Sequence, residues 1–177
     1  RRPAIAPQLT VIGIDPGLRV TGWGIVAEEG AQARAVEYGV IRPAAGLPLP
    51  ERLLTIFREL TAVMARYAPA VAAVETPFVP RVDGGSNRSA LAIGQAQAAA
   101  LLAAGQAGIA VAEYAPAEVK RTVAGYGRGD KAQVQRMIAL QLGLAGSPGP
   151  PDAADALAVA LCHLARRRAA ALREVGT

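Results

Sequence analysis

Cysteine, lysine and long hydrophobic runs are scarce in this 177-residue sequence. Its single cysteine, Cys162, excludes an internal disulfide and is typical of a protein in a reducing cytoplasm. No apolar stretch approaches the roughly 20 residues that a membrane-spanning helix needs. The first residues, Arg1-Arg2-Pro3, are not followed by the apolar segment of a signal peptide. We therefore expect a cytoplasmic protein that does not associate with membranes.

Internal repeats and a second domain are also missing from the sequence. Its length and its hydrophobic content of 52% suit one domain with a sizeable core. We place this domain at residues 9–173, after a basic flexible tail at residues 1–8. The 19 basic and 14 acidic residues give a net charge of +5. A basic chain favours an anionic partner, nucleic acid first.

Hydrophobic periodicity and turn residues predict a chain in which strands and helices alternate. Strands are expected at residues 9–15, 21–27, 33–41, 70–75 and 109–114, and helices at residues 51–66, 89–106, 116–124, 130–142 and 152–173. This order is typical of an α/β fold in which helices flank one sheet.

Two acidic residues lie where a carboxylate is costly, each at the end of an apolar strand. Asp15 ends the run Val11–Ile14 just before Pro16, and Glu75 ends the later strand at residues 70–75. A buried carboxylate needs a cationic partner or hydrogen bonds to offset its desolvation. Because residues at strand C-termini line the ligand-binding crevice of such sheets, we treat both acids as candidate site residues.

A second acidic pair, Asp152 and Asp155, lies at the start of the last predicted helix, three residues apart and therefore on one face. One interpretation is helix capping, because acids near a helix N-terminus stabilise its free N–H groups. The alternative is that this pair converges with Asp15 and Glu75 on divalent cations, which relieve the repulsion between carboxylates. Glu113, at the end of another strand, is either a rival ligand or a hydrogen-bonding neighbour.

Five stretches of the sequence resemble the RuvC family of Holliday junction resolvases. They are "GIDPGLRVTGWG", "VETPF", "SALAIGQA", "YAPAEVKRTVAGYGRGDKAQVQ" and "DAADALAVAL". They follow the order and spacing of the family and span roughly residues 9–164. The resemblance implies a ribonuclease H-like fold, with a five-stranded mixed sheet and helices on both faces.

The resemblance also implies a structure-selective endonuclease of recombination and repair. Members of the family are homodimers that bind a four-way DNA junction and nick two strands symmetrically, using two Mg²⁺ or Mn²⁺ ions in each active site. A branch-migration motor complex is a further partner that the family implies.

Individual residues take roles from the same resemblance. The acidic metal-binding set matches Asp15, Glu75, Asp152 and Asp155, and basic positions near the scissile phosphate match Lys120 and Lys131. The aromatic residue that inserts against junction bases matches Phe78. Four arginines are candidate DNA contacts: Arg81, Arg88, Arg121 and Arg128. The segment 79–87 is longer than is usual in the family, which leaves the roles of the first two open.

The runner-up hypothesis is nucleotide binding, because "GIDPG" also resembles the first phosphate loop of actin-like ATPases and sugar kinases. That architecture needs two half-domains, and 177 residues hold one.

The histidine of the chain, His163, is not a match to the family's ligands, and we expect it to be a helix-face or core residue.

Overall fold

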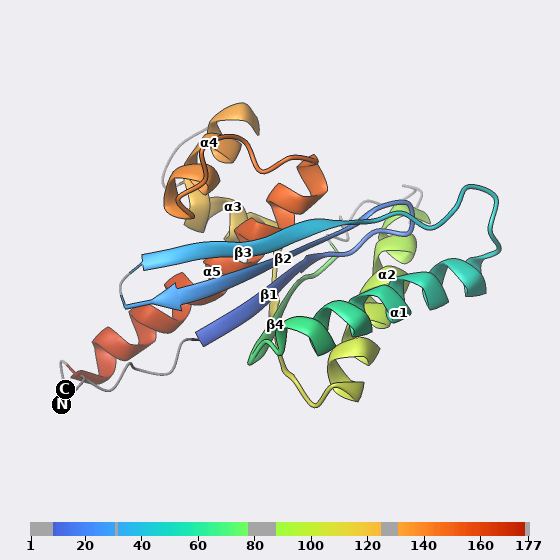
Figure 1. Ribbon diagram of the computed structural model, residues 1–177, viewed down its shortest axis with the longest axis horizontal. Helices are drawn as coiled ribbons and strands as arrows, with labels where there is room; N and C mark the ends of the chain where they lie inside the picture. The colour runs from blue at the N-terminus through green and yellow to red at the C-terminus, as the bar shows by residue number, and fades with distance from the viewer. Residues whose placement is uncertain (1–8, 31, 78–87, 125–130, 176–177) are drawn as a thin grey trace, which may run out of the picture.

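A computed structural model of the chain describes residues 9–30, 32–77, 88–124 and 131–175 (Figure 1). The tail predicted at residues 1–8 lies outside the described residues. The strands are β1 (Leu9–Asp15), β2 (Thr21–Glu29), β3 (Gln32–Ile41), β4 (Val71–Glu75) and β5 (Ala110–Tyr114). The helices are α1 (Leu49–Tyr67), α2 (Arg88–Gln106), α3 (Pro116–Ala124), α4 (Lys131–Gln141) and α5 (Pro151–Val175).

The strands form one mixed sheet in the order β3-β2-β1-β4-β5. β1 pairs antiparallel with β2 and parallel with β4, and β4 pairs parallel with β5. The C-terminal ends of β1, β4 and β5 therefore meet at one end of the sheet, where open α/β sheets bind their ligands. Asp15 and Glu75 are the last residues of β1 and β4.

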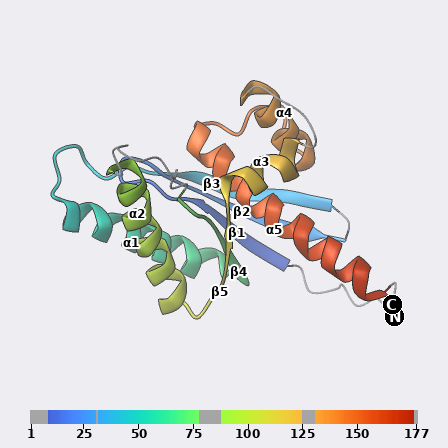
Figure 2. The same cartoon turned by 180° about the vertical axis from the view of Figure 1, so that it is seen from behind.

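Helices cover both faces of this sheet (Figures 1 and 2). On one face, α1 and α2 enclose a core that contains Ile12 and Ile56. On the other, α3, α4 and α5 enclose a second core that contains Val11 and Leu157. The neighbours Val11 and Ile12 enter opposite cores because side chains alternate between the two faces of a strand.

The architecture confirms the predicted α/β class and the five-stranded mixed sheet with helices on both faces. β1 and α3 begin and end at the predicted residues, and α5 continues two residues beyond its predicted end to Val175. Among the described helices, none has both the length and the apolar character needed to cross a bilayer.

Candidate active site

Asp15 and Glu75 are neighbours at the ends of two parallel strands. Ile14 is the register partner of Val74, and these acids are the next residues along β1 and β4. Because side chains alternate, both carboxylates project from the face against which α5 packs. The strand register therefore places two negative charges on the same side of the sheet.

The first two turns of α5 bring Asp152 and Asp155 to the same end of the sheet. Pro151 begins this helix, and its fixed φ and missing N–H suit the first helical position. The helix backbone rests directly on β2, since a Cβ added to Gly22 would lie 1.9 Å from the carbonyl oxygen of Asp152. Gly22 is the cross-strand partner of Asp15. The start of α5 is thus seated next to Asp15.

A buried threonine closes the turn that follows Asp15. Thr21 has no exposed surface, and its Oγ1 donates to the carbonyl of Gly17 at 2.8 Å. The same oxygen accepts from the N–H of Gly17 at 3.2 Å. A Cβ added to Gly17 would lie 2.4 Å from the carbonyl oxygen of Val20, so this tight turn requires glycine. The turn keeps the end of β1 in register with β2.

Burial and nearby carboxylates raise the pKa values of Asp15, Glu75 and Asp155. Burial, followed by the charges of Glu75, Asp155 and Asp152, raises the pKa of Asp15 to about 7. Burial and the charge of Asp155 raise the pKa of Glu75 to about 7. Burial also raises the pKa of Asp155, and the charge of Lys131 opposes this shift. Such mutual effects require charges that are close together in a partly desolvated place, where only cations or protons make them compatible.

The donor chemistry of this cluster fits a divalent cation. Among the described residues, no three Asp, Glu, His or Cys side chains form a ready-made cage around one point. Mg²⁺ needs no such cage, because it is usually held by one or two carboxylates and fills its remaining positions with water and substrate phosphate. Burial is the largest cause of the raised pKa values of Asp15 and Glu75, and the charges of neighbouring acids add to it, so a hard cation would stabilise the ionised forms of both carboxylates.

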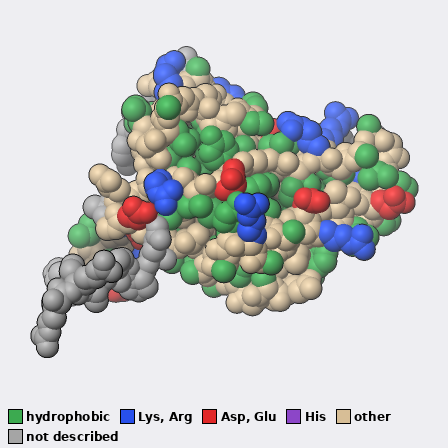
Figure 3. All heavy atoms as spheres, viewed as in Figure 1, with side chains coloured by type: hydrophobic (Ala, Val, Ile, Leu, Met, Phe, Trp, Pro, Cys, Tyr) green, Lys and Arg blue, Asp and Glu red, His purple; other side chains and the backbone are tan. Residues whose placement is uncertain are grey.

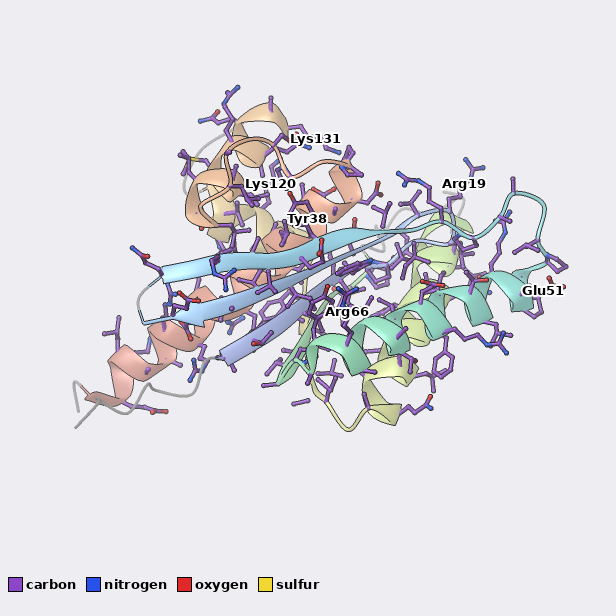
Figure 4. The ribbon with its side chains drawn as sticks, viewed as in Figure 1. Arg19, Tyr38, Glu51, Arg66, Lys120 and Lys131 are labelled. Atoms are coloured by element: carbon purple, nitrogen blue, oxygen red, sulfur yellow. The ribbon has the colours of Figure 1, made fainter. Side chains whose placement is uncertain are left out.

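A pocket of about 330 Å³ opens beside the acids. Its charged lining comes from four different elements, β4, α3, α4 and α5, and comprises Glu75, Lys120, Lys131 and Asp155. Lys131 Nζ lies 4.0 Å from Asp155 Oδ2. Lys120 comes from α3 and Lys131 from the start of α4, and Figure 4 shows them on the same side of the sheet. A pocket that is lined by both carboxylates and ammonium groups is suited to a phosphate bound together with cations.

Side-chain contacts tie the segment that carries Lys120 to α5. They join Tyr114 Oη to His163 Nδ1 at 2.8 Å, Thr122 Oγ1 to Cys162 Sγ at 3.5 Å, and Arg166 to Glu118. His163 is therefore a hydrogen-bonding residue on a helix face, as predicted, and Cys162 is buried and unpaired with another cysteine.

The two arginines that follow Arg166 in α5, Arg167 and Arg168, both donate at 2.6 Å to Glu28. This basic run of α5 is thus engaged in ion pairs with β2 and α3.

Glu113 is not part of the acidic cluster, and its prediction as a rival ligand is wrong. Its register partner on β4 is Val74, the residue before Glu75, so it projects from the opposite face of the sheet. There its Oε1 accepts a hydrogen bond from Gln97 Nε2 of α2 at 2.5 Å. The alternative prediction, a hydrogen-bonding role, is the one confirmed.

Among the candidate DNA contacts, only Arg121 has a described side chain. Phe78, Arg81 and Arg128 lie outside the described residues, as does the side chain of Arg88, whose backbone begins α2. Arg121 is exposed on α3, next to Lys120. On the face seen in Figure 3, basic side chains are spread over the surface and do not form one patch.

Two features near the site were not predicted from the sequence. Arg19 is exposed on the β1–β2 turn, at the end of the sheet that carries Asp15 (Figure 4). Its signal is a cation four residues after the strand-end acid. The glycines that face α5, Gly13, Gly22 and Gly24, lie at alternate positions on two strands, a pattern typical of close approach by another backbone.

Comparison with known proteins supplies the family. The sequence profile of "Crossover junction endodeoxyribonuclease RuvC" matches residues 11–163. The chain belongs to the RuvC family. It is 50% identical over 155 residues to RuvC of Chloroflexus aggregans, an alignment that covers 88% of this chain and 92% of the relative.

Solved structures agree with this membership. RuvC of Thermus thermophilus, determined in complex with a Holliday junction substrate, is 36% identical and matches with a TM-score of 0.78. That match covers 90% of this chain and 95% of the other. The yeast mitochondrial Holliday junction resolvase Ydc2 is 12% identical with a TM-score of 0.63, covers 90% of this chain and 79% of its own, and shows the shared fold alone.

Proposed function

We propose that this RuvC-family chain is a Holliday junction resolvase that cuts a four-way DNA junction by paired symmetric nicks in recombination and repair. Its membership of a family of crossover junction endodeoxyribonucleases supports this function. The observation that carries it is the meeting of Asp15, Glu75, Asp152 and Asp155 at one end of the sheet, beside a pocket lined by two lysines.

The acids are proposed to hold two divalent cations, Mg²⁺ first and Mn²⁺ as its substitute. Asp15 would hold one together with Asp152 or Asp155, and the other together with Glu75. When bound, such cations supply an activated water and stabilise the departing 3′ oxygen of a phosphodiester. Because Asp15 and Glu75 have pKa values of about 7, each is partly protonated near neutral pH, and cations would compete with these protons.

The lysines act on the phosphate itself. Lys120 and Lys131 line the pocket together with Glu75 and Asp155, so a phosphate next to these acids also meets two ammonium groups. Ammonium groups held in place before the reaction stabilise the charge that develops on the phosphate oxygens. Lysine suits this role because it presents a compact positive charge.

Paired nicks require two active sites, and we propose a homodimer formed through the outer surface of α1 and α2. Between these helices lies an almost wholly apolar groove of about 950 Å³. Its lining includes Leu54 and Leu102, whose side chains are 42% and 66% exposed. Apolar side chains this exposed on adjacent helices are typical of a surface that a partner covers. A second copy is the occupant that two coordinated cuts require.

DNA contacts outside the acidic cluster are proposed for Phe78, Arg81, Arg88, Arg121 and Arg128. Stacking of Phe78 on an unpaired base would contribute about 1–3 kcal/mol. The arginines would contact phosphates, so junction affinity is expected to fall steeply as salt increases. A branch-migration motor complex is the proposed protein partner.

A synthetic four-way junction with each strand labelled in turn tests the function. Nicks at symmetric positions in two opposing strands, dependent on Mg²⁺ and absent on a linear duplex of the same sequence, are the expected result. ATP hydrolysis without nicking would instead favour the nucleotide-binding alternative. Family membership favours the nuclease over that alternative.

A further inference from the structure

The acids of the site come from the sheet and from α5, and the distance between these elements is set by packing. Asp15 and Glu75 belong to the sheet, whereas Asp152 lies in the first turn of α5 and Asp155 at the start of its second turn. Their spacing therefore depends on how closely the start of α5 approaches the sheet. That approach is set by the residues of the sheet directly beneath the helix.

Glycine occupies the sheet positions beneath α5 near the acids. A Cβ added to Gly22 would lie 1.9 Å from the carbonyl oxygen and 2.4 Å from the carbonyl carbon of Asp152. Real Cβ atoms do not approach backbone atoms so closely, so any side chain at Gly22 would displace the first turn of α5. Because Gly22 is the cross-strand partner of Asp15, that displacement would change the separation between Asp152 and Asp15 directly.

We infer that Gly22 is a positioning residue for the acidic cluster: its missing side chain seats the start of α5 on β2 and so sets the distance between the helix acids and the strand acids. The inference rests on the proposed function, since it assumes that these acids bind cations together. In this role, Gly22 neither ligates a cation nor contacts DNA, and it acts by setting the position of Asp152.

Gly24 provides a matched control two residues away on the same strand and face. A Cβ added to Gly24 would lie 2.6 Å from Cδ2 and 2.8 Å from Cγ of Leu157, whereas the backbone nitrogen of Leu157 is 3.5 Å away. This clash is with a side chain that can change its rotamer, one and a half turns beyond Asp152 in α5. Gly24→Ala is therefore expected to disturb the core without moving the acids.

Gly22→Ala is expected to fold, because α5 begins after a Pro- and Gly-rich segment, residues 143–150, that lets its first turn move outward. The probe is Mn²⁺ alone, with its affinity measured by electron paramagnetic resonance in the absence of DNA. Gly22→Ala should weaken Mn²⁺ binding about tenfold to a hundredfold, the usual effect of losing a residue that orients metal ligands. Gly24→Ala should lower Tm and leave the Mn²⁺ affinity within about twofold.

Each other outcome overturns the inference. Equal Mn²⁺ affinity in Gly22→Ala and the wild type would show that the separation of the acids does not depend on this glycine. Failure of Gly22→Ala to fold, while Gly24→Ala folds, would make Gly22 a folding residue and not a positioning residue. The proposed function is tested separately by the wild type, which must bind Mn²⁺ and nick the junction before either variant is interpreted.

Discussion

Lys131 Nζ and Asp155 Oδ2 lie 4.0 Å apart at the edge of the acidic cluster. Their side chains are 68% and 43% exposed, and an ion pair this open to solvent adds little to stability. Its effect is electrostatic, since Lys131 lowers the pKa of both Asp155 and Asp15 against the burial that raises them. Lys131 therefore adds little to stability, and its position next to the acids suits it to bind a phosphate.

Lys131→Gln is therefore expected to slow junction nicking about a hundredfold, the typical effect of losing one group that stabilises transition-state charge. The acidic limb of the pH–rate profile should also move to higher pH, because the pKa values of Asp155 and Asp15 rise when the nearby positive charge is removed. Single-turnover rates between pH 6 and pH 9 measure both effects. Arg136→Gln, which removes an exposed charge from the same helix, is the control and should change neither.

Asp15→Asn tests whether the strand-end acid acts in chemistry or in folding. Because Asn keeps the shape of the side chain and removes its charge, junction binding should persist while nicking falls below detection. Gel-shift affinity in the absence of divalent cations and nicking in their presence separate the two properties. Loss of both, together with loss of the folded circular dichroism spectrum, would identify Asp15 as a structural residue.

Metal-free protein should become less stable as pH rises from about 4 to about 7. Burial, together with the charges of neighbouring acids, raises the pKa values of Asp15 and Glu75 to about 7 from the ordinary values of 3.8 and 4.5, so in this range the folded state binds more protons than the unfolded state. The free energy of unfolding then falls with pH, and the stabilisation by bound protons is lost above the folded-state pKa.

Asp15→Asn should remove part of this pH dependence. In EDTA at pH 8 it should raise the free energy of unfolding by about 1–2 kcal/mol, a figure discounted for solvent screening, or a few degrees in Tm. Adding Mg²⁺ at pH 8 should stabilise the wild type more than the variant. Glu37→Gln, at an exposed position of β3, is the matched control. Identical Tm–pH curves for wild type and Asp15→Asn would contradict the prediction.

Leu102→Asp should separate the subunits if α1 and α2 form the dimer surface. Leu102 is 66% exposed in the apolar groove, so the substitution places a charge in the proposed interface and leaves the core of each subunit intact. Light scattering should show a monomer, and nicks on the two strands should lose their pairing. Leu172→Asp, on a 76% exposed residue near the end of α5, should leave the dimer unchanged. A dimer that survives Leu102→Asp places the interface elsewhere.

By itself, the sequence determined the elements and the candidate acids, because these depend on local patterns. β1 ends at Asp15 and β4 at Glu75, as predicted, since apolar runs and the Pro-containing turns after them define strand ends without reference to the rest of the chain. Asp152 and Asp155 share a helix face for the same local reason. The resemblance to the RuvC family, carried by short motifs, was likewise readable from residues alone.

Tertiary structure decided what each acid faces. Glu75 ends β4 and Glu113 is the residue before the end of β5, and the β4–β5 register sends them to opposite faces of the sheet. One residue of register thus separates a site acid from a hydrogen-bond partner of Gln97. The spacing of the glycines is typical of close backbone approach, but only the fold shows that the segment approaching Gly22 is the start of α5, 130 residues away in the chain. Pairing and close packing are long-range properties, and only the folded chain defines them.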